Sequence, residues 1–107
     1  MWYDKNMKKH KLAINWDKQG RHIKGHKNYI PGRSILTADP ELLLQLYADE
    51  GNGLTTYTGV AKNRERFDHT EVIGIYKSED GAYRLPTTRG IIHYSKTGAH
   101  VIPSRPK

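Results

Sequence analysis

Alternation of apolar and polar residues is strongest near the C-terminus of the chain. Two runs of β-branched and aromatic residues flank a short break at Thr97 and Gly98. Such runs on either side of a glycine-containing break are typical of an antiparallel β-hairpin. We therefore predict that residues 87–106 form a hairpin and that the rest of the domain is organised around it.

The length of the hairpin loop decides which side chains share a face of the sheet. A loop of two or four residues that places Ser95 opposite His100 puts both residues on one face together with His93, because paired and alternate residues share a face. The opposite face then carries apolar side chains: Ile92, Tyr94 and Val101. A three-residue loop with a bulge at Gly98 would turn His100 to that apolar face. We favour the first register because it leaves a continuous apolar surface to bury.

One helix is predicted near the middle of the chain. Asp39 suits the N-cap, Pro40 fits the first helical position, and Glu41 favours the positive end of the helix dipole. Apolar residues then recur at helical spacing and are expected to pack on a sheet: Leu42, Leu43, Leu46 and Tyr47. The glycines at positions 51 and 53 are expected to end the helix.

Three other segments have weaker patterns. Residues 12–16 alternate enough for a short strand or a packed extended segment. Residues 17–34 contain three glycines, one proline and few apolar side chains, so we interpret them as a long functional loop. Residues 54–66 are interpreted as a loop with at most one edge strand.

The remaining pattern predicts one further pair of strands. Residues 71–76 read as a strand, and a turn at residues 79–81 returns the chain through residues 82–85 to Pro86, which marks an edge or end of its strand. Together with the C-terminal hairpin, this predicts an α+β domain. In it, the N-terminal loop and helix region packs on a four-stranded antiparallel sheet.

Length and composition limit the domain organisation. With 107 residues, the chain is long enough for one modest core. We expect a flexible basic lead-in at residues 1–11 and a single domain at residues 12–107. No apolar run approaches the roughly 20 residues of a membrane span, so no membrane association is expected. The absence of cysteine excludes disulfides and thiolate metal sites.

Positive charge is concentrated at the two ends of the chain. The formal net charge is +7, with eight bases and two acids in residues 1–28 and four bases and no acid from residue 88 onward. The middle, residues 29–87, has six bases and nine acids. This distribution favours a polyanion such as nucleic acid as the ligand, or else an acidic protein partner.

Several classes of catalytic motif are missing. The sequence has no GxGxxG or phosphate-binding P-loop, no GxSxG and no cysteine nucleophile. His22 and His26 are four residues apart, but Gly25 between them and the lack of an acidic third ligand argue against zinc. We therefore expect neither a metal nor any other cofactor.

Histidines with bases and hydroxyls remain, and these are the groups that metal-free RNA cleavage needs. In that reaction the substrate's own 2′-OH attacks the phosphate, so the protein supplies a general base, a general acid and donors for the charged phosphorane. His93 and His100 are candidates for the acid and base, because imidazole titrates near neutral pH. His22, on the loop, is a third candidate that could close over the phosphate.

The candidate residues for contacts with the substrate lie beside these histidines in the sequence: Arg21, Thr88, Ser95 and Lys96. Structural interpretations stay open for each histidine. His100 could simply cap the hairpin, and His93 could be a half-buried core residue. His69 is more readily explained by local hydrogen bonding, and His26 by a place on the surface or in loop packing.

Four motifs carry a resemblance to a known family: KQGRHIKGHKNY, GRSILTADPELLL, VIGIY and TTRGIIHYSKTGAHVIPSRP. They resemble the domain called polymorphic toxin type 50, which occurs at the C-termini of bacterial secreted toxins and of some phage head-morphogenesis proteins. The resemblance spans residues 14–106. It implies the barnase-EndoU-colicin-RelE fold, in which a helical part precedes a four-stranded antiparallel sheet, and by analogy a ribonuclease activity.

The resemblance also implies site residues and partners. Two family elements contain the matching positions: Lys18, Gln19, Arg21 and His22 in KQxRHIxG, and Thr87, Thr88, His93, Ser95 and His100 in PTTxGIIHYSKxGxHIVP. Lys18 thereby joins the substrate-binding candidates. The family implies a delivered effector that acts on RNA, with tRNA among its candidate substrates, in the cytoplasm of a target cell. It also implies a cognate immunity protein, for which an acidic surface would complement this chain.

Our hypothesis from the sequence is a monomeric, metal-independent endoribonuclease toxin that leaves 2′,3′-cyclic phosphate ends. In it, His22, His93 and His100 form the catalytic set. The competing hypothesis is a non-catalytic module of a phage or secreted protein that binds RNA or protein. A deoxyribonuclease is disfavoured because the usual acidic cluster for metal ions is missing.

Overall fold

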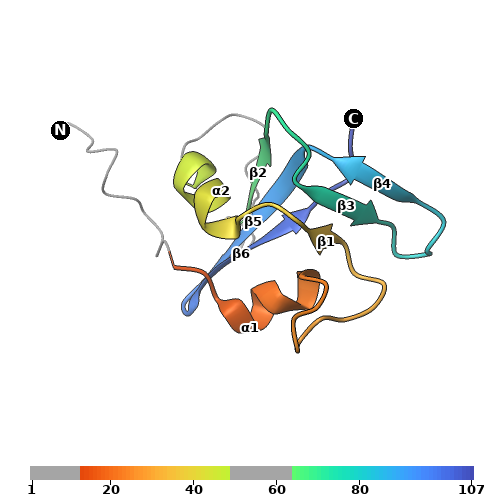
Figure 1. Ribbon diagram of the computed structural model, residues 1–107. Helices are drawn as coiled ribbons and strands as arrows, with labels where there is room; N and C mark the ends of the chain where they lie inside the picture. Colours follow the sequence, from red (N-terminus) through yellow and green to blue (C-terminus); the bar gives the residue numbers. More distant parts are fainter. Residues whose placement is uncertain (1–12, 49–63) are drawn as a thin grey trace.

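The computed structural model describes residues 13–48 and 64–107 (Figure 1). The helices are α1 (Trp16–Gln19), the 3-10 helix η1 (Gly20–His22) and α2 (Pro40–Tyr47). The strands are β1 (Ile35–Leu36), β2 (Arg64–Asp68), β3 (Gly74–Lys77), β4 (Arg84–Thr87), β5 (Arg89–Ser95) and β6 (Gly98–Pro103). The predicted lead-in at residues 1–11 and the expected helix stop at residues 51 and 53 lie outside the described residues. None of the helices in the described part is long and apolar enough to cross a membrane.

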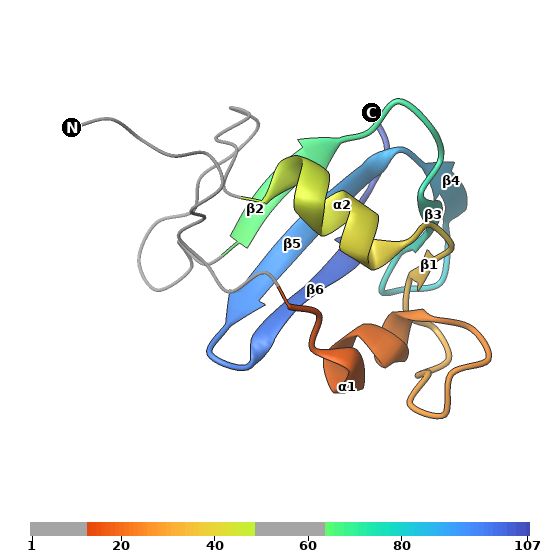
Figure 2. The same ribbon diagram turned by 60° about the vertical axis from the view of Figure 1, so that its left-hand side comes forward.

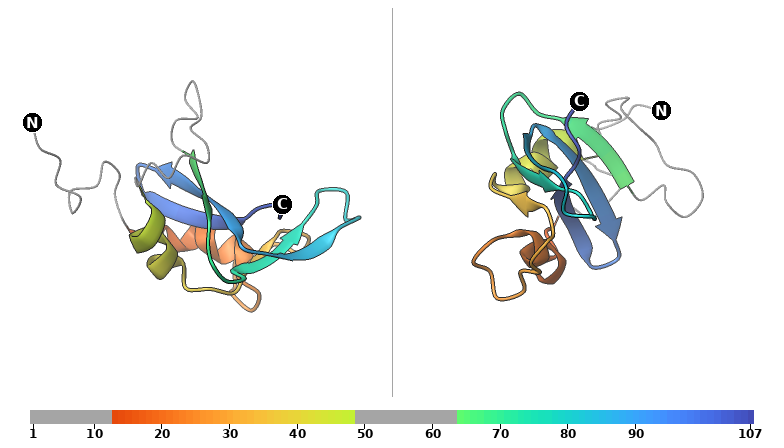
Figure 3. Two further views of the ribbon diagram at one scale, coloured as in Figure 1. Left: turned by 90° about the horizontal axis from the view of Figure 1, so that it is seen from above. Right: turned by 90° about the vertical axis from the view of Figure 1, so that its right-hand side faces the viewer.

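The strands form two antiparallel sheets of three strands each, in the orders β1-β3-β4 and β2-β5-β6. The α+β class is confirmed, but the expectation of one four-stranded sheet was wrong. The four predicted strands divide into two pairs, and each pair gains a third strand, because β1 pairs with β3 and β2 pairs with β5. β2 begins inside the segment where one edge strand was allowed, and it lies at the edge of its sheet. Figure 3 shows the β3–β4 hairpin extending away from β5 and β6.

A bend at Thr88 carries the chain from one sheet to the other. The neighbouring Thr87 is 1% exposed, and its hydroxyl donates to the Ser104 carbonyl at 2.7 Å. The same oxygen accepts a hydrogen bond from the backbone N–H of Arg89 at 3.0 Å. The Thr87 side chain therefore fixes the point where β4 ends and β5 begins.

The predicted helix start is confirmed at α2. Asp39 is the N-cap and accepts a hydrogen bond from the Glu41 N–H at 2.9 Å, and Pro40 occupies the first turn. The expected packing face was wrong in part, because Leu42 and Leu46 are 51% and 45% exposed. The buried stripe instead follows the i, i+3, i+4, i+7 spacing of a helix: Pro40, Leu43, Leu44 and the half-buried Tyr47.

The core lies between α2 and the β2-β5-β6 sheet. Figure 2 shows α2 lying across one face of this sheet. The side chains that fill the layer are almost completely buried: Leu43, Leu44, Phe67, Ile73, Ile92 and Val101. Gly90 is required there, because a Cβ at this position would lie 2.5 Å from the Phe67 ring.

The C-terminal hairpin is confirmed, and its register differs from the predicted one by two residues. Ser95 pairs with Gly98, and His93 pairs directly with His100 across a two-residue loop. Gly98 lies within the ladder with φ 126°, and a Cβ there would come 2.5 Å from the Ala13 carbonyl oxygen. In this register Gly98, which has no Cβ, packs against Ala13, far away in the sequence. A shift of two residues preserves the faces, so the predicted shared face of His93 and His100 is confirmed.

The segment predicted as a long loop begins instead with α1 and η1, which lie along the outer edge of β6. Ile14 forms a parallel bridge with Ala99, within the segment expected to be extended. The Asn15 N–H donates to the Ala99 carbonyl at 2.8 Å, and the Ala99 N–H donates to the Ala13 carbonyl at 2.7 Å. These bonds cover an edge that would otherwise expose unpaired backbone groups.

The β3–β4 hairpin agrees closely with the predicted pattern. β3 begins later than expected, at Gly74, but the turn at Asp80 and Gly81 is present, with Gly81 at φ 76°. The Asp80 carboxylate accepts hydrogen bonds from the Ser78 hydroxyl and the Ala82 N–H. Pro86 lies in β4, an edge strand, where its missing N–H removes no ladder bond from a central strand.

Candidate active site

Three imidazole rings form one row across the edge of the β2-β5-β6 sheet. His93 on β5 and His100 on β6 are a cross-strand pair with ring centroids 5.1 Å apart and planes 28° apart. His22 on η1 stacks on His100 at 6.1 Å with an interplanar angle of 19°. His100 therefore lies in the middle, and the three candidate catalytic histidines are brought together.

Gln19 holds η1 in place beside β6. Its side chain is fully buried, its Nε2 donates to the Val101 carbonyl at 2.9 Å, and its Oε1 accepts from the Val101 N–H at 2.7 Å. The amide thus pairs with β6 as a strand neighbour would. Because His22 follows three residues later in the same helical segment, this double hydrogen bond sets the position of His22 against His100.

His22 is fixed in its orientation by a backbone contact. It is 4% exposed, and its Nδ1 lies 3.0 Å from the Ser34 carbonyl oxygen. A carbonyl oxygen only accepts, so Nδ1 carries the hydrogen and the neutral ring has its lone pair on Nε2. The sequence led us to expect His22 on a loop that closes over a phosphate. The structure instead holds the His22 ring in a 3-10 helix, on the other side of His100 from His93.

The surroundings of the row favour neutral imidazoles. Burial lowers the pKa of His93 to about 4, with further lowering by the charges of Arg64, His22 and Lys18. Burial likewise lowers the pKa of His100 to about 3, followed by the effects of His93 and His22. The pKa of His22 is also lowered, chiefly by burial, although its bond to Ser34 acts in the opposite direction.

Cationic side chains surround the row and give it a positive potential. Arg64 lies directly opposite His93 on β2, and Lys18 acts on both His93 and His100. Arg21 acts on His22 and His100. All of these charges disfavour protonated imidazoles, so a bound anion would reverse the effect and raise the three pKa values.

The other predicted substrate contacts are distributed along the hairpin. Ser95 donates to the Gly98 carbonyl at 2.8 Å and lies 3.2 Å from the Thr97 hydroxyl, so it stabilises the turn. Lys96 is exposed in the turn itself. Thr88 donates to Asp68 at 2.6 Å near the opposite end of β5. Five residues of extended strand, or roughly 16 Å, separate it from His93, so it does not join the row.

The two remaining described histidines have structural partners. His69 Nδ1 lies 2.6 Å from the Tyr47 hydroxyl, in agreement with its interpretation as a locally bonded residue. His26 accepts the Asn28 N–H at 3.0 Å and packs against Gly20, where a Cβ would lie 2.2 Å from the ring. Across residues 13–48 and 64–107, no group of three or more His, Cys, Asp or Glu side chains could hold a metal ion.

Two residues of the site were not among the site residues predicted from the sequence. The position of Arg64 beside His93 depends on β2, whose sequence RERFD has four charged residues and only one apolar residue. Gln19 was noted only as part of a matching motif. A buried amide that pairs with a strand backbone has no periodic signal, and only its place in that motif indicated importance.

Comparison with known protein families adds an independent finding. The sequence model of the family described as bacterial toxin 50 matches residues 14–103. The chain belongs to this family. The match confirms the resemblance drawn from the motifs, and it covers both the histidine row and the Gln19 contact. No curated protein matches the chain. Membership in bacterial toxin 50 gives the domain a toxin role.

Proposed function

We propose that this toxin domain is a metal-independent endoribonuclease. The observation that carries the proposal is the row of three stacked imidazoles, His22, His100 and His93, surrounded by cationic side chains. Histidines gathered at one place favour an enzyme over a module that only binds RNA or protein. His93 and His100 are each partly exposed, while His22 is buried, so the pair that reaches solvent is His93 and His100.

His93 and His100 share the two proton transfers. A neutral imidazole, favoured at neutral pH by the lowered pKa values, accepts the proton of the 2′-OH as it attacks the adjacent phosphate. The phosphate charge raises the pKa of the neighbouring ring, which takes up a proton from solvent when the RNA binds and then donates it to the leaving 5′-oxygen. The bond from the 2′-oxygen to phosphorus forms as the bond from phosphorus to the 5′-oxygen breaks, which gives a 2′,3′-cyclic phosphate and a 5′-hydroxyl, and the base returns its proton to solvent.

His22 and the cations support this pair. His22 stacks on the buried side of His100 and acts as a positioning residue, because its own ring is 4% exposed. Lys18 and Arg21 bind phosphate oxygens and stabilise the extra negative charge of the phosphorane. Ser95 and Lys96, at the turn, and Thr88, at the other end of β5, contact neighbouring parts of the RNA.

The biological setting that fits this activity is a delivered effector acting on RNA in a target cell. Its RNA substrates include tRNA as a candidate, and the parent protein is a secreted toxin or a phage protein. The net charge of +7 complements an acidic immunity protein, which would inhibit the domain by covering the histidine row. The domain acts as a monomer and needs no cofactor.

Cleavage of RNA by the purified protein in EDTA tests the proposal. We expect cleavage to continue in chelator and to be lost in His93→Ala and His100→Ala. His69→Gln is the matched control, because glutamine can keep the hydrogen bond to Tyr47 outside the row. Loss of cleavage in chelator, or full activity in both row variants, would overturn the proposal.

A further inference from the structure

A small hollow lies on the β2-β5-β6 sheet, at the opposite end of β5 from the turn that joins β5 to β6. Its volume is about 60 Å³, and it is lined by Arg66, Phe67, Arg89 and Ser104. Since one water needs roughly 10–15 Å³ of such volume, the hollow has room for a few waters or one tetrahedral oxyanion.

The Arg89 guanidinium has hydrogen-bonding capacity left over in this hollow. Its Nε is buried without a hydrogen-bond partner, and the nearest carboxylate oxygen, Asp68 Oδ2, lies 3.7 Å away, beyond hydrogen-bond distance. Asp68 is already engaged through its other oxygen by the Thr88 hydroxyl at 2.6 Å. A buried donor without an acceptor calls for an explanation, and a bound acceptor supplies one.

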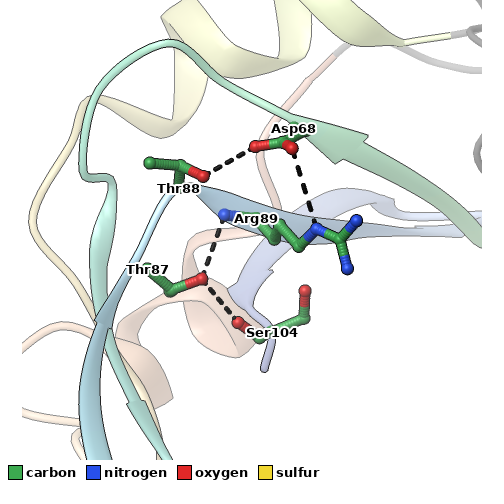
Figure 4. A network of polar contacts seen from close by, with 5 residues as sticks. All are labelled: Asp68, Thr87, Thr88, Arg89 and Ser104. Carbon is green, nitrogen blue, oxygen red and sulfur yellow. Dashed lines mark hydrogen bonds and ion pairs between the residues drawn. The ribbon is translucent and has the colours of Figure 1, made fainter. Parts of the chain in front are cut away.

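Figure 4 shows how the polar groups are arranged around this side chain. The two terminal nitrogens of Arg89 extend beyond Asp68, and the Ser104 hydroxyl is directed toward the guanidinium in this view. The Ser104 backbone is held in place, because its N–H donates to the Arg89 carbonyl at 2.9 Å and its carbonyl accepts from Thr87. A guanidinium fork and a hydroxyl carried on a fixed backbone are groups that bind phosphate oxygens.

The hollow and the histidine row lie on the same face of the sheet. Arg89, Ile91 and His93 alternate along β5 and therefore share the face opposite α2. Four residues of strand separate Arg89 from His93, a distance of about 13 Å. Between them, Ile91 pairs with Ile102, and both are half-buried. This apolar pair provides a surface against which an unstacked base can pack.

The geometry points to a second phosphate subsite, in which Arg89 and Ser104 bind a backbone phosphate of single-stranded RNA whose scissile phosphate lies at the histidine row. The identity of the ligand as RNA rests on the proposed function. The strand runs along β5 and β6, with the Ile91 and Ile102 pair between the two phosphates. A substrate with one phosphate cannot fill both places, so the subsite distinguishes oligonucleotides from dinucleotides.

An RNA phosphate fits these observations better than a carboxylate of a protein partner. The hollow lies on the same face of the sheet as the histidine row and along the same strand, β5. An extended strand of nucleotides that runs along β5 places phosphates at both positions. The unpartnered Nε of Arg89 lies in a pocket rather than on a projecting surface. A protein partner would contact the exposed rim, and its binding is treated below as an outcome of the test.

The test measures binding without cleavage. Full-length protein is titrated with 2′-O-methyl oligonucleotides, which lack the attacking hydroxyl, and binding is followed by fluorescence anisotropy. We expect Arg89→Gln to weaken binding of a tetranucleotide about tenfold, as for loss of a charge-assisted contact. Binding of a dinucleotide with one phosphate should remain unchanged. Arg84→Gln is the matched control, because Arg84 is exposed on β4 in the other sheet.

A second variant distinguishes loss of phosphate binding from loss of folding. Arg89→Lys keeps the charge beside Asp68 but loses the planar fork, so it should remain folded and still weaken tetranucleotide binding. In the unaltered protein, inorganic phosphate should shift the NMR resonance of the Arg89 Nε–H. Equal loss for dinucleotide and tetranucleotide, no loss in either Arg89 variant, or a shift with acidic peptide but none with phosphate would overturn the subsite.

The outcome is separable from that of the proposed function. If no RNA is cleaved but the Arg89 variants lose tetranucleotide binding selectively, the ribonuclease proposal fails and the phosphate subsite stands. If cleavage depends on His93 and His100 while Arg89 has no effect on any oligonucleotide, the reverse holds.

Discussion

His93 and His100 face each other directly across the β5–β6 hairpin, with ring centroids 5.1 Å apart. Placing two groups that both become positive when protonated at this distance lowers the affinity of each for a proton. In the free protein, burial lowers both pKa values and keeps the pair neutral near pH 7; the charges of Arg64, His22 and Lys18 add to this at His93, and the effect of His93 adds to it at His100. The arrangement becomes favourable for protonation only when a negatively charged ligand lies beside it.

Replacement of the central ring should remove activity without unfolding the domain. We expect His100→Gln to lower kcat/KM for RNA by about 10²–10⁴-fold, the range for loss of an acid or base. Its thermal unfolding temperature should change little, because a partly exposed neutral ring is replaced by a neutral amide. A loss of activity that follows a loss of folded protein in circular dichroism would contradict this.

Stability should fall as the pH is lowered from about 6.5. The pKa values of His93 and His100 are lower in the folded state, so the unfolded chain binds protons first, starting near the ordinary value of 6.5. The part of the unfolding free energy that comes from these neutral rings is complete above this pH. It is lost as the pH falls toward the folded-state pKa values of about 4 and about 3. Each such histidine contributes a slope of up to about 1.4 kcal/mol per pH unit.

Urea unfolding at pH 7.0 and pH 5.5 measures this dependence, in a range where most carboxylates stay ionised. The double variant His93→Gln, His100→Gln should have a smaller loss of unfolding free energy between the two pH values than the unaltered protein. An identical pH dependence in both proteins would show that the two rings are not responsible for it.

Outside the apolar core, loss of the Gln19 contact should be among the changes that lower the stability of the domain most. Gln19→Ala leaves the Val101 N–H and carbonyl of β6 without their partner and should lower the free energy of unfolding by about 2–4 kcal/mol. Because the contact positions η1, the His22–His100 stack should also loosen. Gln45→Ala, on the exposed side of α2, is the matched control and should change stability by less than about 0.5 kcal/mol.

A pair of neighbouring leucines tests the observed packing face of α2. Leu43 is fully buried and Leu42 is 51% exposed. Leu43→Ala should cost about 2–5 kcal/mol of unfolding free energy, as for a cavity in a core. Leu42→Ala should cost less than about 0.5 kcal/mol. Chemical denaturation of both variants checks this, and similar losses at the two positions would mean that the helix face is assigned incorrectly.

Much of the site could be predicted because strand alternation depends only on local sequence. The apolar residues Ile92 and Val101 identify the buried face, and His93 and His100 then fall on the other face in any register of the same parity. The start of α2 was equally predictable, since Asp39 and Pro40 act through adjacent backbone groups. These features need no information from distant parts of the chain.

Other features depend on contacts between distant residues. Gly98 lies in the ladder beside Ala13, which is far away in the sequence, so the local apolar pattern gave the correct faces but a register shifted by two residues. Leu42 and Leu44 are both apolar, and only the sheet determines which one is buried. The strand β2 is mostly charged, because its outward side chains include Arg64 and Arg66 and only Phe67 is buried. The split into two sheets occurs at the Thr88 bend, and β1 and β2 each add a third strand to one sheet; the pattern allowed for an edge strand in the segment where β2 begins but did not identify β1.

The nature of the RNA ends tests the central claim most directly. A short RNA with a single cleavage site, incubated with the protein in EDTA, is analysed by ³¹P NMR for its phosphate products, beside the same RNA carrying a 2′-deoxy nucleotide at that site. We predict a 2′,3′-cyclic phosphate from the first RNA, no cleavage of the second, and no product of either kind with His100→Gln. Products ending in 5′-phosphate, or cleavage of the 2′-deoxy RNA, would contradict 2′-OH attack assisted by the histidine row.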